Sequence, residues 1–164
     1  GRATHEAAMY KSRAVTEIVG IPSATLRDWR SQGKDFEGIW GEDRKKDHSY
    51  SRRGLLSLGI MKRVRESGGS IEDAWQTAFW AVDEVARWLD VWNIEGWAPN
   101  ELHKDKLTTH ARWCILTDGT PIVTDDASHA RDVEGDSCLV RLVDLKRLAD
   151  GLPRKLVSEL RIAE

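Results

Sequence analysis

The sequence lacks the features that define several large protein classes. It contains no apolar run of the roughly 18 residues that a membrane helix needs, and no signal peptide precedes the first patterned segment. Cys114 and Cys138 are the two cysteines of the 164 residues, and neither belongs to a CxxC pair or to a His-rich zinc spacing. We therefore expect a cytoplasmic protein with reduced thiols, no membrane contact and no bound metal.

Signatures of catalysis are equally scarce. The chain has no glycine-rich phosphate loop and no carboxylate pair with a supporting motif. His110 and Cys114 would face the same side of a strand, as a nucleophile and its base or two metal ligands would, but a packed histidine and a core thiol are the favoured interpretation. Asp125, Asp126 and His129 are too few ligands for a cation. We expect no enzymatic activity and no cofactor.

Charge is distributed unevenly along a chain whose net charge is only -2. Residues 1–69 hold 14 Lys and Arg against 9 Asp and Glu, whereas residues 70–164 hold 11 against 18. The hydrophobic content of 40% is enough for a real core, so the chain is not expected to be disordered. A basic first half and an acidic second half indicate that only the first half contacts a polyanion.

The segment of residues 9–29 has the pattern of two short helices joined by a glycine turn. Ser12 can cap the first helix, Gly20 permits the sharp turn, and Pro22 can open a second helix that ends near Gly33. The apolar positions that can pack the two helices together are Val15, Ile18, Val19, Ile21, Leu26 and Trp29. The side chains left facing outward are Ser23, Thr25, Arg27 and Asp28. The pattern predicts a helix-turn-helix that reads the major groove of DNA.

A two-stranded ribbon is predicted after this helix pair. Two β-prone pieces, residues 36–40 and 48–51, flank a polar tip at residues 42–47. Basic residues at the tip, Arg44, Lys45 and Lys46, would lie along a phosphate backbone. The alternative is a solvated turn, because acidic residues flank the cluster.

Two longer helices are expected next. Ser51 caps a helix over residues 52–66, which the glycine pair at residues 68–69 ends. Ser70 and Asp73 form a capping-box-like start for a helix that continues to about residue 92, as one helix or as two.

The second of these helices is rich in tryptophan and carries a broad apolar face. The residues of this face that are assigned to pairing two copies of the chain are Trp75, Phe79, Val82, Val85, Leu89 and Trp92. A dimer seam is the favoured interpretation, because aromatic residues are enriched at interfaces. An aromatic pocket for a small apolar or cationic effector and an intrachain core are the two alternatives.

The C-terminal part has a different periodicity. After a connector, strands at residues 111–116 and 121–124 flank Asp118 and Gly119, with Pro121 confining the second strand to an edge. A further strand at residues 137–143 and short helices at 144–150 and 153–162 complete the expected elements.

The chain is therefore expected to be mainly α with small β. The predicted organisation is a disordered arm at 1–8, a winged helix-turn-helix at 9–80, a dimerisation helix and connector at 81–106, and a small α+β module at 107–164. The last module is expected to lean on the Trp-rich helix and is a candidate surface for a protein partner.

The order of these pieces resembles the winged helix-turn-helix DNA-binding domain of the MerR family, over about residues 9–80. The matching pieces are Val19-Gly20-Ile21 with Ser23, Thr25-Leu26-Arg27-Asp28-Trp29, Tyr50-Ser51 ahead of Leu55, Glu66-Ser67-Gly68, and Ser70-Ile71-Glu72-Asp73. Metal-sensing members carry cysteines beside the dimerisation helix, and none is present there in this chain. The resemblance does not extend to the C-terminal part.

The resemblance implies that Ser23, Thr25 and Arg27 face the major groove, with Asp28 turned to a cytosine amine or a neighbouring arginine. The further residues expected to contact DNA are Arg30, Tyr50, Arg52 and Arg53. The predicted function is a dimeric, sequence-specific transcriptional regulator of double-stranded DNA, associated with a bacterial or phage nucleoid. An excisionase-like DNA-bending factor and a protein-interaction module with a relic helix-turn-helix are the alternatives.

Overall fold

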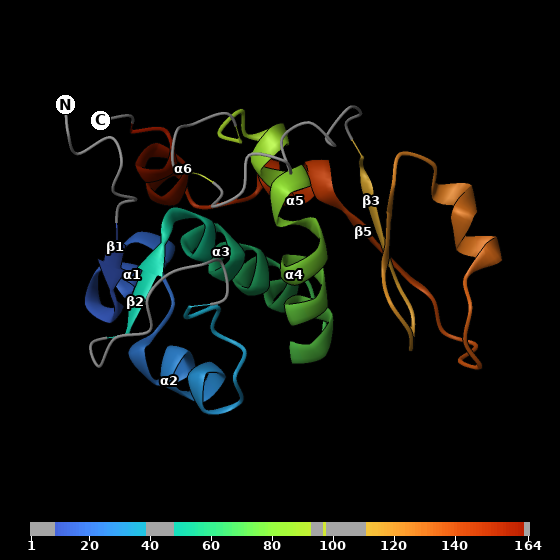
Figure 1. Ribbon diagram of the computed structural model, residues 1–164, viewed down its shortest axis with the longest axis horizontal. Coiled ribbons are helices and arrows are strands. Elements are labelled where there is room, and N and C mark those ends of the chain that lie inside the picture. The colour runs from blue at the N-terminus through green and yellow to red at the C-terminus, as the bar shows by residue number, and fades with distance from the viewer. Residues whose placement is uncertain (1–8, 39–47, 93–96, 98–110, 163–164) are drawn as a thin grey trace.

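The computed structural model describes residues 9–38, 48–92, 97 and 111–162. The predicted arm at 1–8, the ribbon tip with its three basic residues, most of the connector and His110 lie outside the described residues. The elements of the first half are β1 (Met9–Lys11), α1 (Ser12–Val19), α2 (Ser23–Ser31), β2 (Ser49–Ser51), α3 (Arg52–Glu66) and α4 (Ile71–Trp88). Those of the second half are β3 (Trp113–Leu116), β4 (Ile122–Thr124), the 3-10 helix η3 (Ala127–Asp132), β5 (Arg141–Asp144), α5 (Leu145–Asp150) and α6 (Arg154–Leu160). Figure 1 shows α3 and α4 between the α1–α2 pair and the three-stranded sheet. The expectation of a mainly α protein with small β is confirmed.

The turn between α1 and α2 forms as the sequence predicts. Gly20 has the left-handed φ of 82°, and its N–H donates to the carbonyl of Thr16 at 3.0 Å, which closes α1. The predicted N-cap is wrong by one residue, because Lys11 precedes the helix and Ser12 is its first residue. The Ser12 hydroxyl instead accepts a hydrogen bond from Arg30 on α2.

The predicted ribbon is wrong in its pairing. Strand β2 pairs antiparallel with β1, with Tyr50 opposite Tyr10, and residues 36–38 form no strand. Phe36 is fully buried and stacks on Trp75 at a centroid distance of 4.4 Å. The apparent β propensity of this segment therefore came from an aromatic side chain that fills the core. An aromatic residue raises the β propensity of a segment whether or not the segment forms a strand, so the sequence pattern alone does not distinguish the two cases.

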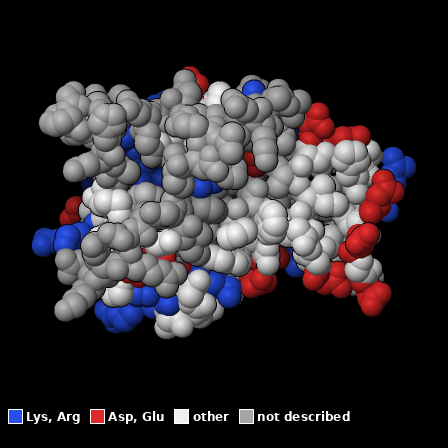
Figure 2. Space-filling model, in the orientation of Figure 1, with Lys and Arg blue, Asp and Glu red and all other residues white. Residues whose placement is uncertain are grey.

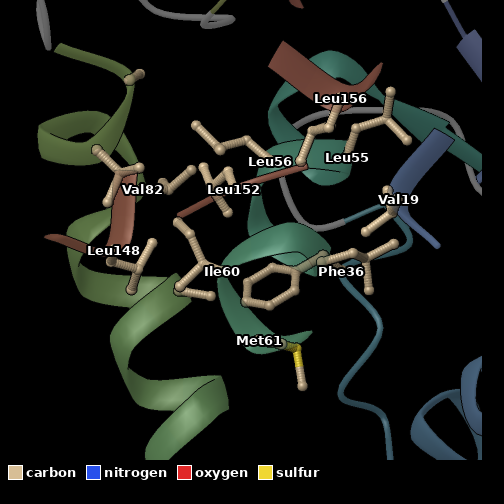
Figure 3. Packing of buried hydrophobic residues seen from close by; sticks show 14 of the residues in the cluster. Val19, Phe36, Leu55, Leu56, Ile60, Met61, Val82, Leu148, Leu152 and Leu156 are labelled. Atoms are coloured by element: carbon tan, nitrogen blue, oxygen red, sulfur yellow. The ribbon is translucent and has the colours of Figure 1, made fainter. Parts of the chain in front are cut away.

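Helix α3 is the central element of the core. Its N-cap is Ser51, whose hydroxyl accepts from the N–H of Gly54 at 3.1 Å, as predicted. The apolar side chains of α3 with no exposed surface are Leu55, Leu56, Leu58, Ile60 and Met61. Figure 3 shows that Leu55, Leu56, Ile60 and Met61 do not all point to one side of the helix. A helix that is apolar on more than one side is buried by several neighbours. Here α1, α4, α5 and α6 all contact it.

Helix α4 is one continuous helix that ends at Trp88, four residues earlier than the predicted limit. Its start is confirmed, since Ser70 and Asp73 form a complete capping box. Val82, Val85 and Leu89, predicted for a dimer seam, are at most 6% exposed. They lie in the core of the same chain, where α3, α5 and β3 pack against α4. The seam prediction is therefore wrong for these three residues, because the C-terminal elements cover this face.

The C-terminal elements share that core. The sheet order is β4-β3-β5 with antiparallel pairs, so β4, which follows Pro121, is an edge strand as predicted. Helix α5 packs on α4, whereas α6 reaches back to α1 and α3 (Figure 1). Leu156 and Leu160 of α6 are fully buried, and the hydroxyl of Tyr10 on β1 donates to Glu159 at 2.8 Å. The apolar core is therefore continuous across the predicted boundary at residue 107.

Candidate nucleic-acid interface

Helix α2 presents a polar face to solvent. Ser23, Arg27 and Asp28 are exposed and Thr25 is partly exposed, while Leu26 and Trp29 on the other side of the helix are 2% and 5% exposed. Positions three or four residues apart share a face of the helix, so the polar residues lie on the exposed side and the apolar residues on the buried side, as the sequence predicts. Arg27 makes no hydrogen bond or ion pair within the described part of the chain, so its guanidinium is available to a ligand.

Arg30 is held inside the fold rather than on that face. Its Nη2 donates to the hydroxyls of Ser12 and Tyr50, both at 2.8 Å, and its Nε lies 3.3 Å from Asp35. Tyr50 also donates to Asp35 at 2.7 Å and has no exposed surface. Burial, followed by the bond to Asp35, raises the pKa of the Tyr50 hydroxyl and keeps it neutral.

The assignment of Tyr50 to DNA contact is therefore wrong. The reason is its place on β2, between α1 and the start of α3, where its ring fills the core and its hydroxyl closes the network. Tyr50 instead fixes α2 relative to the rest of the domain, through Arg30 and Asp35.

The two arginines that begin α3 are also buried. Arg52 and Arg53 are each 6% exposed, and Arg53 makes a two-bond contact with Asp83 of α4, at 3.1 and 2.6 Å. The indole N–H of Trp97 donates to the same carboxylate at 3.1 Å. The predicted phosphate contacts of this pair are wrong, because both residues are buried and Arg53 is held by Asp83 of α4.

Two cations that the sequence analysis did not assign lie next to α2. A hollow of about 500 Å³ separates α2 from the end of α3, and Lys62 and Arg65 line it together with Thr25 and Asp28. Lys62 pairs with Glu66 at 3.1 Å, and Arg65 is exposed and donates to the carbonyl of Gly69. Their three-residue spacing on the polar side of α3 was a usable signal, but only the fold brings that side to α2.

The charges separate along the molecule. Figure 2 shows Lys and Arg gathered at the end formed by α1 and α2, and a rim of Asp and Glu at the opposite end, beyond the sheet. The acidic residues of that end, in and around η3, are Asp118, Asp125, Asp126, Asp132, Glu134 and Asp136. The acidic end would be repelled by a polyanion, so it favours one orientation of the protein on such a partner.

Cys114 and His129, the candidates for catalytic or metal-binding roles, both lie in surroundings that suit a structural role. Cys114 is fully buried, and burial, followed by the nearby charge of Glu84, raises the pKa of its thiol to about 12, so it is no nucleophile at neutral pH. His129 shares a hydrogen bond of 2.8 Å with Thr124. Over the described ranges, no group of three His, Cys, Asp or Glu side chains is placed to hold a metal ion.

No known protein-family model matches this chain, and no match is found among curated proteins. Among the helices that the structure describes, none is long and apolar enough to span a membrane. The resemblance to the MerR family thus rests on the motifs of residues 9–80 and stays a prediction.

Proposed function

We propose that the protein binds double-stranded DNA by placing α2 in the major groove. The observation that carries this proposal is the exposed face of Ser23, Thr25 and Arg27 on a short helix whose other side is packed through Leu26 and Trp29. An arginine on such a helix can bind the O6 and N7 atoms of guanine with two hydrogen bonds. The serine and threonine hydroxyls can bind either base edges or phosphates.

A rigid support for α2 favours this role. The bonds from Arg30 to Ser12, Tyr50 and Asp35 connect α2 to α1, β2 and the segment after α2. Recognition of base edges requires side chains held within fractions of an ångström, which a helix packed through Leu26 and Trp29 and anchored by Arg30 can provide.

The charge distribution supports the same orientation. Lys62 and Arg65 line the hollow beside α2, with Asp28 of α2 and Glu66 of α3 as the opposing charges there. Contacts between such cations and phosphates release counterions, so the affinity is expected to fall steeply with salt.

The proposed biological role is a sequence-specific transcriptional regulator that reads two half-sites with two copies of the chain. Of the six residues predicted to pair the copies, Trp75, Phe79 and Trp92 retain partly exposed surface, whereas Val82, Val85 and Leu89 do not. Any contact between copies through α4 would therefore use its aromatic residues rather than its aliphatic core face.

The deciding experiment compares Arg27→Ala with the control Arg131→Ala, an exposed arginine of η3 at the acidic end. Genomic fragments that the protein retains are recovered and sequenced, and the affinities for the recovered site and for a random duplex are measured at several salt concentrations. Arg27→Ala should cost about 1–3 kcal/mol on the recovered site and much less on the random duplex, because it removes a base contact. Arg131→Ala should change neither affinity.

Two outcomes would refute the proposal. One is the absence of any binding to duplex DNA at low salt, and the other is an equal loss for the two variants on both duplexes. The positions of the recovered fragments separate the possible roles, since promoters indicate regulation and attachment junctions indicate an excisionase-like factor. The mass of the complex reports whether one or two copies are bound.

A further inference from the structure

A second cavity lies away from the face of α2. It occupies about 490 Å³ between the turn that joins α3 to α4 and the unit formed by β5 and α5. Its apolar walls are contributed by Val64, Leu116, Leu142, Val143 and Leu148. This volume is within the range of small-molecule sites, roughly 300–1,000 Å³, and we refer to the cavity as the β5 cleft.

Charged side chains line the β5 cleft. Two aspartates among them, Asp73 and Asp144, are each already paired with an arginine of the protein. Arg141 binds Asp73 at 2.9 Å, and Asp73 also accepts from the N–H of Ser70. Asp144 accepts two bonds from Arg112, at 3.1 and 2.9 Å, and a third from the N–H of residue 147. These aspartates have little remaining capacity to neutralise further cations.

Arg63 and Arg147 supply the remaining positive charge. Arg147 is 85% exposed along its side chain, and its Nε lies 3.9 Å from Asp144, beyond hydrogen-bond distance. Arg63 donates from Nη1 to the Ser67 hydroxyl at 3.2 Å, and no carboxylate of the described residues lies within ion-pair distance of it. Its Nε is buried without a hydrogen-bond partner.

The position of Arg63 at the end of α3 accounts for part of this arrangement, because a cation is favoured near the carbonyl end of a helix. The exposed Arg65, also in the last turn of α3, donates to the carbonyl of Gly69 in the turn that follows the helix. Arg63 instead lies against Gly151, with its guanidinium where a β-carbon on that glycine would be, and borders the apolar cleft. The Arg63 side chain is partly exposed, its Nε is buried without a hydrogen-bond partner, and no carboxylate of the described residues neutralises it, so an anion bound in the cleft would be favoured there.

We propose that the β5 cleft binds a small organic carboxylate with a flat apolar body. The carboxylate is held by Arg63 from α3 and Arg147 from α5, whose forked donors match its two oxygens. The apolar body lies against Val64, Leu142 and Leu148. This site is separate from the α2 face, and its existence does not depend on DNA binding.

The test uses the full chain, with sodium 2-naphthoate as the probe. Titration calorimetry measures the binding. The neutral analogue 2-naphthylmethanol and inorganic phosphate test the two halves of the ligand. The variants are Arg63→Gln and Arg147→Gln, and the control is Arg131→Gln, which removes the same charge at the acidic end. Amide NMR shifts of Gly68, Gly69 and Leu142 locate the site.

We expect one saturable site per chain, with affinity for 2-naphthoate at least about tenfold higher than for either the alcohol or phosphate. Each cleft variant should lower the affinity about tenfold or more, and the control should leave it unchanged. Arg147→Gln keeps the test decisive if Arg63→Gln does not fold, because Arg147 is on the surface. The proposal is overturned by the absence of saturable binding, by equal affinity for the alcohol or phosphate, by unchanged affinity in the cleft variants, or by shifts confined to other residues.

Discussion

Arg27 and Arg30 are three residues apart on α2 and have different surroundings. Arg27 is exposed, whereas Arg30 donates to Ser12 and Tyr50 and pairs with Asp35. One turn of helix therefore separates a residue free to bind a partner from one that holds the helix in place. This difference decides which arginine is a candidate for specificity, and residue type alone does not show it.

Tyr50→Phe tests the support of α2. The change removes the hydroxyl that donates to Asp35 and accepts from Arg30, and Asp35 is only 5% exposed. Because a buried carboxylate loses a hydrogen bond that water cannot replace, we expect about 1–3 kcal/mol less stability in urea unfolding.

The matched control for this change is Tyr10→Phe, which removes a bond of similar length to a carboxylate, that of Glu159, at a more exposed site. A smaller loss is expected there, because water can solvate the carboxylate. A loss as large as that of Tyr50→Phe, or no loss from Tyr50→Phe, would show that the Arg30 network does not hold α2.

At the scale of elements, α3 organises the molecule because four other helices pack around it. Gly59 lies where α6 packs against α3. A β-carbon at Gly59 would overlap with Cδ2 of Leu156 on α6, so the absence of a side chain sets the distance between the two helices. The sequence shows a glycine within a predicted helix, where it is unfavourable by about 0.5–1 kcal/mol relative to alanine. Only the position of α6 explains it.

Gly59→Ala is expected to destabilise the protein by about 1 kcal/mol, because overpacking that costs roughly 1–3 kcal/mol exceeds the gain in helix propensity. Thermal and urea unfolding measure the change. Adding Leu156→Ala should give a double variant that is more stable than the sum of the single changes predicts, since the smaller residue leaves room for the methyl group.

A control for the same substitution is Gly119→Ala, where a β-carbon would meet the Thr117 hydroxyl oxygen at an ordinary contact distance of 3.6 Å. Its stability should stay close to that of the parent. Additive losses in the double variant would mean that Gly59 is not required by the α3–α6 contact.

At the scale of the whole molecule, the acidic second half both fills the core and forms the acidic end. Glu84 on α4 shows the cost of placing a carboxylate near that core. Burial, followed by the charge of Asp83, raises the pKa of Glu84 to about 7 from its ordinary 4.5, although Arg53 and Arg87 oppose the shift. Between these two values the folded protein retains a proton that the unfolded chain has lost.

Global stability should therefore fall as the pH rises from about 4.5 to about 7, and the contribution of Glu84 should be constant above that range. Glu84→Gln removes this contribution, so the variant should be more stable than the parent above pH 7, by up to about 3 kcal/mol. Urea unfolding across pH 4.5–8 measures it. The control Glu17→Gln, on the exposed side of α1, should keep the slope of the parent, and the same slope in Glu84→Gln would contradict the assignment.

The sequence by itself determined the features that depend on a few neighbouring residues. Gly20 ends α1, the Ser51 hydroxyl caps α3, and Ser70 with Asp73 begins α4. Helical periodicity also placed Ser23 and Arg27 on the exposed side of α2. These signals are local because a cap, a turn or a helix face is defined within one or two turns of backbone.

Only the tertiary structure decided which surfaces remain accessible. Strand β2 pairs with β1, which buries Tyr50, and α4 approaches the start of α3, which buries Arg53. The C-terminal helices and sheet cover the face of α4 that includes Val85, and the same packing forms the β5 cleft around Arg63. Such contacts join residues far apart in the chain, and the burial of an apolar or charged side chain depends on that long-range packing rather than on its local pattern.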